Sequence, residues 1–226
     1  MAIFQKLKFP YRFTALFCAS FALANIQSVA ADKSPEVLQL KWPCPVAEAF
    51  DSNHMPVYFW QHTFADGVQD LAMARVRTGE ALDAKRVTFG GSVAPGCHYK
   101  TLAIARGGNW GWHLLWLAEG SPVLRYARMD GDAWVSSPTK KLSANAHPVT
   151  QPAILSFDQQ LWVVWYESNA GINKIYAVFS DDEGRSWGDV KLVAETVNPP
   201  GDLQLLLKGN KPYLIGQGIA EGIALQ

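Results

Sequence analysis

Short apolar segments that end in tryptophan recur along this chain at a nearly constant spacing. Residues 55–60, 112–116 and 161–165 share this pattern, and their last tryptophans are 56 and 49 residues apart. Residues 212–216 fit the pattern without a tryptophan. Short apolar runs bounded by turn residues are typical of β-strands. The chain is therefore predicted to repeat one β-sheet unit about every fifty residues.

Each repeat adds further strands around this central segment. A short apolar run precedes it, and another strand follows it after a polar or glycine-containing turn. No helical period is visible in the chain beyond its first 31 residues. The unit is therefore a four-stranded antiparallel meander, which suits a blade of an all-β propeller. The predicted inner strands are residues 45–50, 101–105, 152–156 and 203–207.

Residues 180–187, with the sequence SDDEGRSW, form the predicted turn between the third and fourth strands of the third repeat. Asp182 can accept hydrogen bonds from backbone N–H groups of its own turn, and Gly184 can adopt a positive φ angle. Trp187 can pack as an apolar plug between neighbouring sheets. The second repeat carries a degraded version at residues 129–134, and the first repeat lacks it.

The octet reads S-x-D-x-G-x-x-W and resembles the Asp box of sialidases and related β-propellers. This resemblance implies a sialidase-like propeller of six four-stranded blades, in which the Asp boxes lie away from the active site. A structural role is therefore expected for Ser180, Asp182, Gly184 and Trp187. Three full blades and part of a fourth are visible, so we expect an N-terminal piece of a longer propeller. The alternatives to a longer chain are an assembly of several chains that closes the ring, or a small propeller.

Residues 1–31 have the features of a signal peptide. Lys6, Lys8 and Arg12 form a positive segment, residues 13–24 are apolar, and small residues precede Asp32. The apolar stretch is shorter than the roughly 20 residues that a membrane span needs, and no later run is long enough to span a bilayer. We therefore expect an exported protein, periplasmic or secreted, with a propeller domain at residues 32–226.

Charge and cysteine content narrow the function further. The full chain has 20 Lys and Arg and 20 Asp and Glu. Removing three basic residues with the signal peptide leaves 17 against 20, a net charge of −3. Nothing in this balance suggests binding to nucleic acid or to an anionic membrane. The two remaining cysteines, Cys44 and Cys97, would by default form a disulfide in an oxidising compartment.

The resemblance to sialidases also implies an arginine triad, an aspartate acid/base and a tyrosine nucleophile paired with glutamate. Residues 36–43, near the expected domain start, contain no arginine of the kind that the family places there. Catalytic residues are therefore not identifiable in this chain. The leading hypothesis is a non-catalytic module that recognises a carbohydrate or protein at the propeller face. The alternative is an exo-sialidase-type glycoside hydrolase whose remaining catalytic residues lie beyond Gln226.

Aligning the repeats places Cys44, Cys97, His98 and His147 just before successive inner strands, which converge on the central mouth of a propeller. Because thiolates and imidazoles bind copper or zinc, these four residues suggest a second alternative, a periplasmic metal-handling factor. Under the leading hypothesis no cofactor is required, and the cysteines form the disulfide. Loop carboxylates and an aromatic ring would then bind the ligand. The residues predicted to bind at the mouth are His98, His147, Glu119, Glu167, Asp202 and Trp110.

Overall fold

The computed structural model describes residues 43–76, 83–108, 111–143, 147–219 and 222–225. The predicted signal peptide and Trp110 lie outside these ranges, so both remain predictions. Within the ranges, no helix has the length and apolar character needed to cross a membrane.

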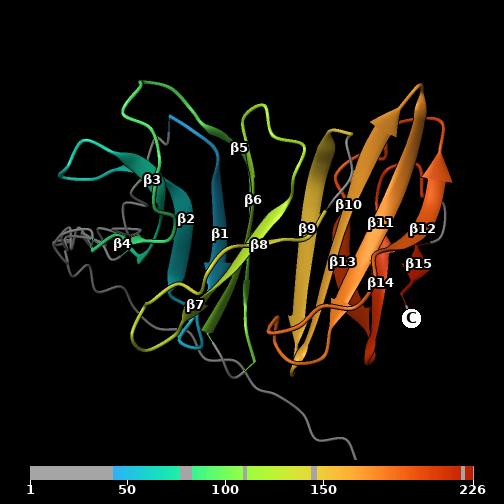
Figure 1. Cartoon of the computed structure of the whole chain (residues 1–226). Helices are drawn as coiled ribbons and strands as arrows, with labels where there is room; N and C mark the ends of the chain where they lie inside the picture. Colours follow the sequence, from blue (N-terminus) through green and yellow to red (C-terminus); the bar gives the residue numbers. More distant parts are fainter. Residues whose placement is uncertain (1–42, 77–82, 109–110, 144–146, 220–221, 226) are drawn as a thin grey trace, which may run out of the picture. The chain divides into compact units, whose positions relative to one another are not determined.

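The described residues form four antiparallel sheets that follow one another along the chain (Figure 1). In each sheet every strand pairs with its neighbour in sequence, so the sheet is a simple meander. Three sheets have four strands and the fourth has three. The prediction of an all-β fold built from four-stranded units is confirmed.

The strand bounds of the first two sheets are as follows. The first contains β1 (Val46–Phe50), β2 (Pro56–Thr63), β3 (Gln69–Arg75) and β4 (Lys85–Arg86). The second contains β5 (Tyr99–Arg106), β6 (Gly111–Ala118), β7 (Arg125–Asp130) and β8 (Lys140–Lys141).

The last two sheets continue the pattern. The third contains β9 (Val149–Phe157), β10 (Gln160–Asn169), β11 (Ile172–Ser180) and β12 (Lys191–Thr196). The fourth contains β13 (Gln204–Lys208), β14 (Lys211–Ile215) and β15 (Ile223–Ala224).

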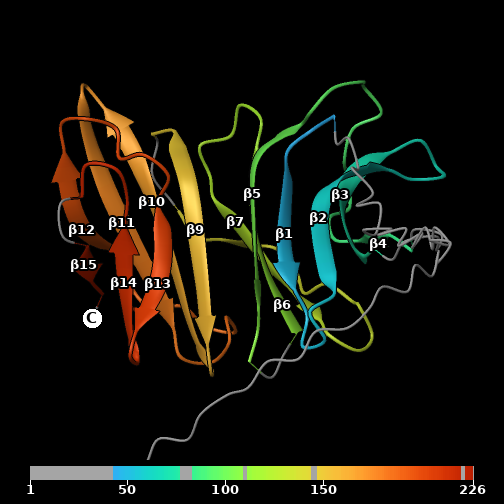
Figure 2. The same ribbon diagram turned by 180° about the vertical axis from the view of Figure 1, so that it is seen from behind.

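The sheets pack face to face like blades, with their first strands side by side. Strand β5 contacts both β1 and β9, and β9 also contacts β13; Figure 2 shows these inner strands from behind. Phe59 and Trp116 meet edge to face between the first two sheets, with ring centroids 6.3 Å apart. Trp165 lies in the cluster between the second and third sheets, and Trp162 and Leu214 lie in the next. The repeated apolar segments therefore supply the inter-sheet cores.

The two ends of each sheet carry different connections between strands. All inner strands begin at one end, which we call the mouth end. The turns between second and third strands and the loops between sheets lie there. The opposite end, which we call the box end, carries the turns that follow the first and third strands.

A β-bulge alters the mouth end of β5. The register with β6 shifts between Tyr99 and Thr101, so one extra residue is inserted. Leu102 and Ile104 face the first sheet, and Ala103 faces the third. Without the bulge, strand alternation would point Tyr99 toward the third sheet with Ala103. Instead Tyr99 packs against the cluster shared with the first sheet, because the extra residue reverses its direction.

The turn at residues 180–187 joins the third sheet to the second. Within the turn, the Asp182 carboxylate accepts hydrogen bonds from the Ser186 backbone N–H at 2.8 and 3.0 Å. Gly184 has a φ of 77°. A Cβ on Gly184 would lie only 1.9 Å from the Tyr126 hydroxyl oxygen of the second sheet. Trp187 meets the Tyr126 ring edge to face at 4.9 Å. The turn therefore closes directly onto the preceding sheet.

The degraded version of this turn in the second sheet makes a similar contact. Asp130 Oδ1 accepts hydrogen bonds from the backbone N–H groups of Asp132 and Ala133, at 2.9 and 2.6 Å. The guanidinium of Arg75, on the first sheet, lies 4.8 Å from the centre of the Trp134 ring. Both turns between a third and a fourth strand thus contact the sheet before their own.

Candidate ligand-binding site

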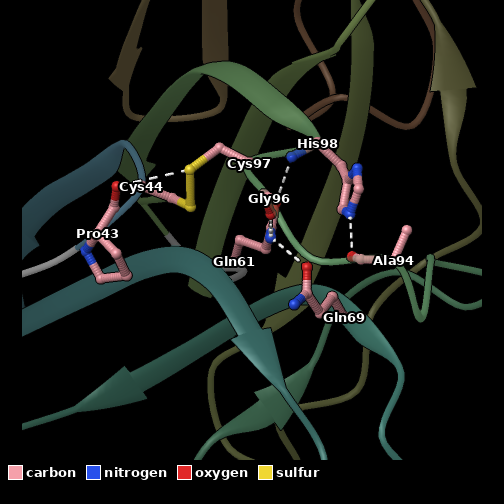
Figure 3. The surroundings of a disulfide bond; sticks show 8 residues. All are labelled: Pro43, Cys44, Gln61, Gln69, Ala94, Gly96, Cys97 and His98. Carbon is pink, nitrogen blue, oxygen red and sulfur yellow. Dashed lines mark hydrogen bonds between the residues drawn. A yellow bond between two sulfur atoms is a disulfide. The ribbon is translucent and has the colours of Figure 1, made fainter.

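The loop at residues 87–98 connects the first two sheets at the mouth end, and its C-terminal end is attached to the first sheet. Cys97 forms a disulfide with Cys44, which lies just before β1, with Cα atoms 5.5 Å apart (Figure 3). The side-chain oxygen of Gln61, on β2, accepts a hydrogen bond from the His98 backbone N–H at 2.7 Å. We call this segment the joining loop. Its two attachments hold it against the first sheet.

The joining loop covers one residue of β3 very closely. A Cβ on Gly91 would lie 1.9 Å from the backbone oxygen of Gln69 and 2.6 Å from Asp70 Oδ1. Any side chain at this position would therefore push the loop away from the sheet. The close approach keeps Asp70 out of contact with bulk water, and its exposed fraction is 0%.

A cavity of about 260 Å³ lies between the joining loop and the mouth end of the second sheet. It combines a carboxylate, three hydroxyl groups, a guanidinium and aromatic rings. Its described lining consists of Asp70, Thr88, Phe89, Gly90, Tyr99, Trp116, Ala118, Arg125 and Thr139. We call it the Asp70 cavity.

The buried carboxylate of Asp70 is only partly satisfied. Its Oδ1 accepts a hydrogen bond from Thr88 Oγ1 at 3.0 Å. Its Oδ2 accepts no hydrogen bond from the described residues. Arg86 Nε lies 3.7 Å from Oδ2, and the Arg86 guanidinium donates two hydrogen bonds of 2.9 Å to Asp66. Because a buried charged oxygen without a donor is costly, Oδ2 keeps an unused acceptor in the wall of the cavity.

Tyr99 supplies a neutral hydroxyl to the same cavity. Its oxygen lies 3.4 Å from Thr88 Oγ1. Thr88 gives its one proton to Asp70, so Tyr99 is the donor in this pair. Burial raises the pKa of Tyr99 above its ordinary value of 10.0, and the Asp70 charge adds to the rise, while the Thr88 hydrogen bond and the Arg125 charge oppose it. The phenol therefore stays protonated, and its lone pairs remain available to a ligand.

Two further side chains complete the cavity. Arg125, at the start of β7, forms no ion pair within the described part of the chain. Phe89, on the joining loop, is 74% exposed. An exposed phenylalanine beside a polar cavity provides a flat apolar surface next to hydrogen-bonding groups.

The mouth residues predicted from the sequence lie apart from this cavity. His98 Nε2 lies 2.8 Å from the Ala94 carbonyl oxygen, within the joining loop. His147 lies before β9, and its Nε2 is 3.2 Å from Nδ2 of Asn169, the last residue of β10. Glu119 forms an exposed ion pair with Lys100 at 3.0 Å. Asp202 precedes β13. None of these four predicted residues is among the described residues that line the Asp70 cavity.

The prediction that Glu167 lies in a mouth turn is wrong. Strand β10 continues to Asn169, so Glu167 lies within the strand and is only 3% exposed. Its carboxylate accepts a hydrogen bond of 3.0 Å from Trp165 Nε1. The Glu167 carboxylate therefore serves as the hydrogen-bond acceptor of the buried Trp165 indole N–H.

The four residues of the hypothetical metal site do not come together as ligands. The sulfur atoms of Cys44 and Cys97 are bonded to each other, so neither is a free thiolate. His98 and His147 have the separate neighbours described above. Across the described ranges, no group of three or more His, Cys, Asp or Glu residues could hold a metal ion. The residues present therefore do not fit copper or zinc at this position.

No family model and no curated protein matches this chain. Several solved structures resemble part of it, and the following three are among them. An exo-β-1,3-galactanase from Phanerochaete chrysosporium is 13% identical, with 76% of this chain and 41% of that chain covered and a TM-score of 0.45. An exo-β-1,3-galactanase from Clostridium thermocellum is 10% identical over 76% and 41%, with a TM-score of 0.47. An α-L-arabinanase from Cellvibrio cellulosa, complexed with arabinohexaose, is 11% identical over 79% and 70%, with a TM-score of 0.47.

The chain spans about two fifths of the length of the two galactanases that it resembles. At these identities and scores, the likeness carries no information about what this chain binds.

Proposed function

We propose that this chain is an exported, non-catalytic module that recognises a carbohydrate in the Asp70 cavity. The observation that carries the proposal is the buried Asp70 carboxylate with an unused oxygen, in a cavity that also contains Tyr99 and Arg125 and has exposed Phe89 in its lining. Sugar hydroxyls both donate and accept hydrogen bonds, so they match a carboxylate, a phenol and a guanidinium. The C–H face of a sugar ring can pack on the exposed phenyl ring.

The shape of the site favours a sugar over a protein partner. A protein interface generally buries a broad surface of several hundred Å² on each partner. The Asp70 cavity is small and concave, and its polar groups converge from β3, β5, β7 and the joining loop. Such an arrangement is typical of a small-molecule site, in which a few polar groups fix the orientation of the ligand.

The described lining also favours binding without catalysis. Glycoside hydrolysis generally requires two carboxyl groups, roughly 5 to 9.5 Å apart, on either side of the bond that is cleaved. Among the described residues that line the cavity, Asp70 alone has a carboxyl group. A glycoside hydrolase, of sialidase type or another, would need its second carboxyl group from elsewhere.

The proposal is tested with the exported protein on an array of neutral and acidic glycans, followed by calorimetric titration of the glycan that binds. The substitutions Asp70→Asn and Phe89→Ala should each weaken binding at least tenfold. Phe50→Ala is the matched control, because Phe50 is also an exposed phenylalanine, at 55%, but lies at the box end. Unchanged thermal unfolding of each variant shows that the fold is intact.

Three results would contradict this function. They are an array without a bound glycan, equal loss of affinity in the Phe89 and Phe50 variants, and release of free sugar from the bound glycan. The last result would support the hydrolase alternative.

A further inference from the structure

A second cavity, of about 490 Å³, opens at the mouth end on the other face of the second sheet. Its lining includes Lys100, Thr101, Leu117, Ser121 and Thr150. Leu117 belongs to the apolar cluster between the second and third sheets, whereas Trp116 of the Asp70 cavity belongs to the cluster between the first and second. The two cavities therefore lie on opposite sides of the same sheet end.

Only the tip of the second sheet separates the two cavities. Ala118, the last residue of β6, lines both of them. Tyr99 and Lys100 are consecutive on β5, and Tyr99 lines the Asp70 cavity while Lys100 lines the second one. The β-bulge causes this division, because it turns Tyr99 toward the first sheet and leaves Thr101 facing the third. We call this tip the crest.

We infer that the ligand is an oligosaccharide that crosses the crest, with one sugar unit in the Asp70 cavity and further units in the second cavity. This inference rests on the proposed function and names its ligand class. A monosaccharide would occupy one cavity alone. Because the cavities share a lining residue, a linear chain can occupy both without a break in contact.

The chemistry of the second cavity suits the rest of such a chain. The Thr150 hydroxyl donates a hydrogen bond of 3.3 Å to the Tyr166 carbonyl oxygen. The Ser121 hydroxyl accepts one of 3.3 Å from the Val123 backbone N–H. Each hydroxyl group keeps further hydrogen-bonding capacity for a ligand. Lys100, with an exposed side chain at the crest, can exchange its exposed partner Glu119 for a sugar hydroxyl at little cost. Pro122 and Pro148 add flat apolar surface.

The test is a calorimetric series with the array-selected glycan, from the monosaccharide to the hexasaccharide. Affinity should rise at least tenfold when the chain becomes long enough to reach the second cavity, and then level off at one ligand per protein. Ser121→Trp, which fills the second cavity, should reduce the affinity of the hexasaccharide to that of the monosaccharide. Binding of the monosaccharide should not change. Ser52→Trp, on an exposed turn at the box end, is the matched control.

Lys100→Ala serves as a milder variant if the tryptophan disturbs folding, and it should weaken only the longer glycans, by a few fold. Equal affinity along the series, or two monosaccharides bound per protein, would overturn the inference but leave the proposed function standing. Loss of monosaccharide binding in Ser121→Trp, with thermal unfolding unchanged, would also overturn it. If no glycan binds, the proposed function fails and this inference fails with it.

Discussion

Replacing both half-cystines, Cys44→Ser with Cys97→Ser, should lower the free energy of unfolding by about 4 kcal/mol. The two residues are 53 apart in sequence. In the chain-entropy model, closing a loop of that length removes about 14 cal/mol/K from the unfolded chain, or about 4 kcal/mol at 25 °C. The folded state should persist, because Gln61 still holds the joining loop through the His98 backbone N–H and the Gly96 carbonyl oxygen.

Urea unfolding of the oxidised protein, the reduced protein and the double variant measures this effect. The reduced protein and the variant should unfold at the same lower urea concentration, and a reducing agent should not affect the variant. Glycan binding should weaken severalfold, because Thr88 and Phe89 lie on the loop that has been loosened. If the variant loses less than about 1 kcal/mol, the disulfide does not constrain the unfolded chain as the entropy model requires.

Three further predictions concern the joint between sheets and its response to acid. Gly184→Ala should cost about 2–4 kcal/mol in urea unfolding, because it adds a strained positive φ to a clash with Tyr126; Gly120→Ala, with a φ of 69° and open space around it, should cost only about 1 kcal/mol. His113, on β6, is fully buried, and its Nδ1 lies 2.7 Å from the hydroxyl of Tyr126. Burial lowers the pKa of His113 from 6.5 to about 3, so the unfolded state takes up a proton first, and stability should fall as the pH drops from 6.5 toward 3. A series of urea titrations at different pH values should show that His113→Gln flattens this decline. Burial would raise the pKa of Asp182, but its hydrogen bonds within the turn lower this pKa to about 2. The contribution of the Asp182 carboxylate to stability, present in full above pH 3.8, should therefore disappear as the pH falls through about 2. Asp182→Asn should remove that loss of stability from the same series of urea titrations.

The strand order could be predicted from the sequence because each repeat has the same sequence of apolar segments and turns. Trp116 and Trp165 are buried between sheets, as the spacing of the tryptophans suggests. The turn at residues 180–187 could be placed between a third and a fourth strand for the same reason. Periodicity identifies what every repeat shares, and these features are shared.

The candidate site could not be predicted because it depends on features that differ between repeats. Asp70 lies in the third strand of the first sheet and becomes buried only because Gly91 lets the joining loop approach. Tyr99 reaches the same cavity only because of the β-bulge, which the alternation of apolar and polar residues does not reveal. Glutamate is usually exposed, so the sequence pattern predicts Glu167 in a turn, whereas the structure buries it beside Trp165, whose indole N–H donates a hydrogen bond to it. The pair of glycines at residues 90–91 was the one signal of a tight approach.

The contact of Gly184 with Tyr126 has a consequence for how such a chain can grow by duplication. The turn at residues 180–187 fits onto Tyr126 of the preceding sheet, whereas Trp134 of the second sheet contacts Arg75 one sheet earlier. The two partners differ, so each repeat is matched to its own predecessor. A tandem copy of the third repeat would therefore need a new partner residue on the sheet before it.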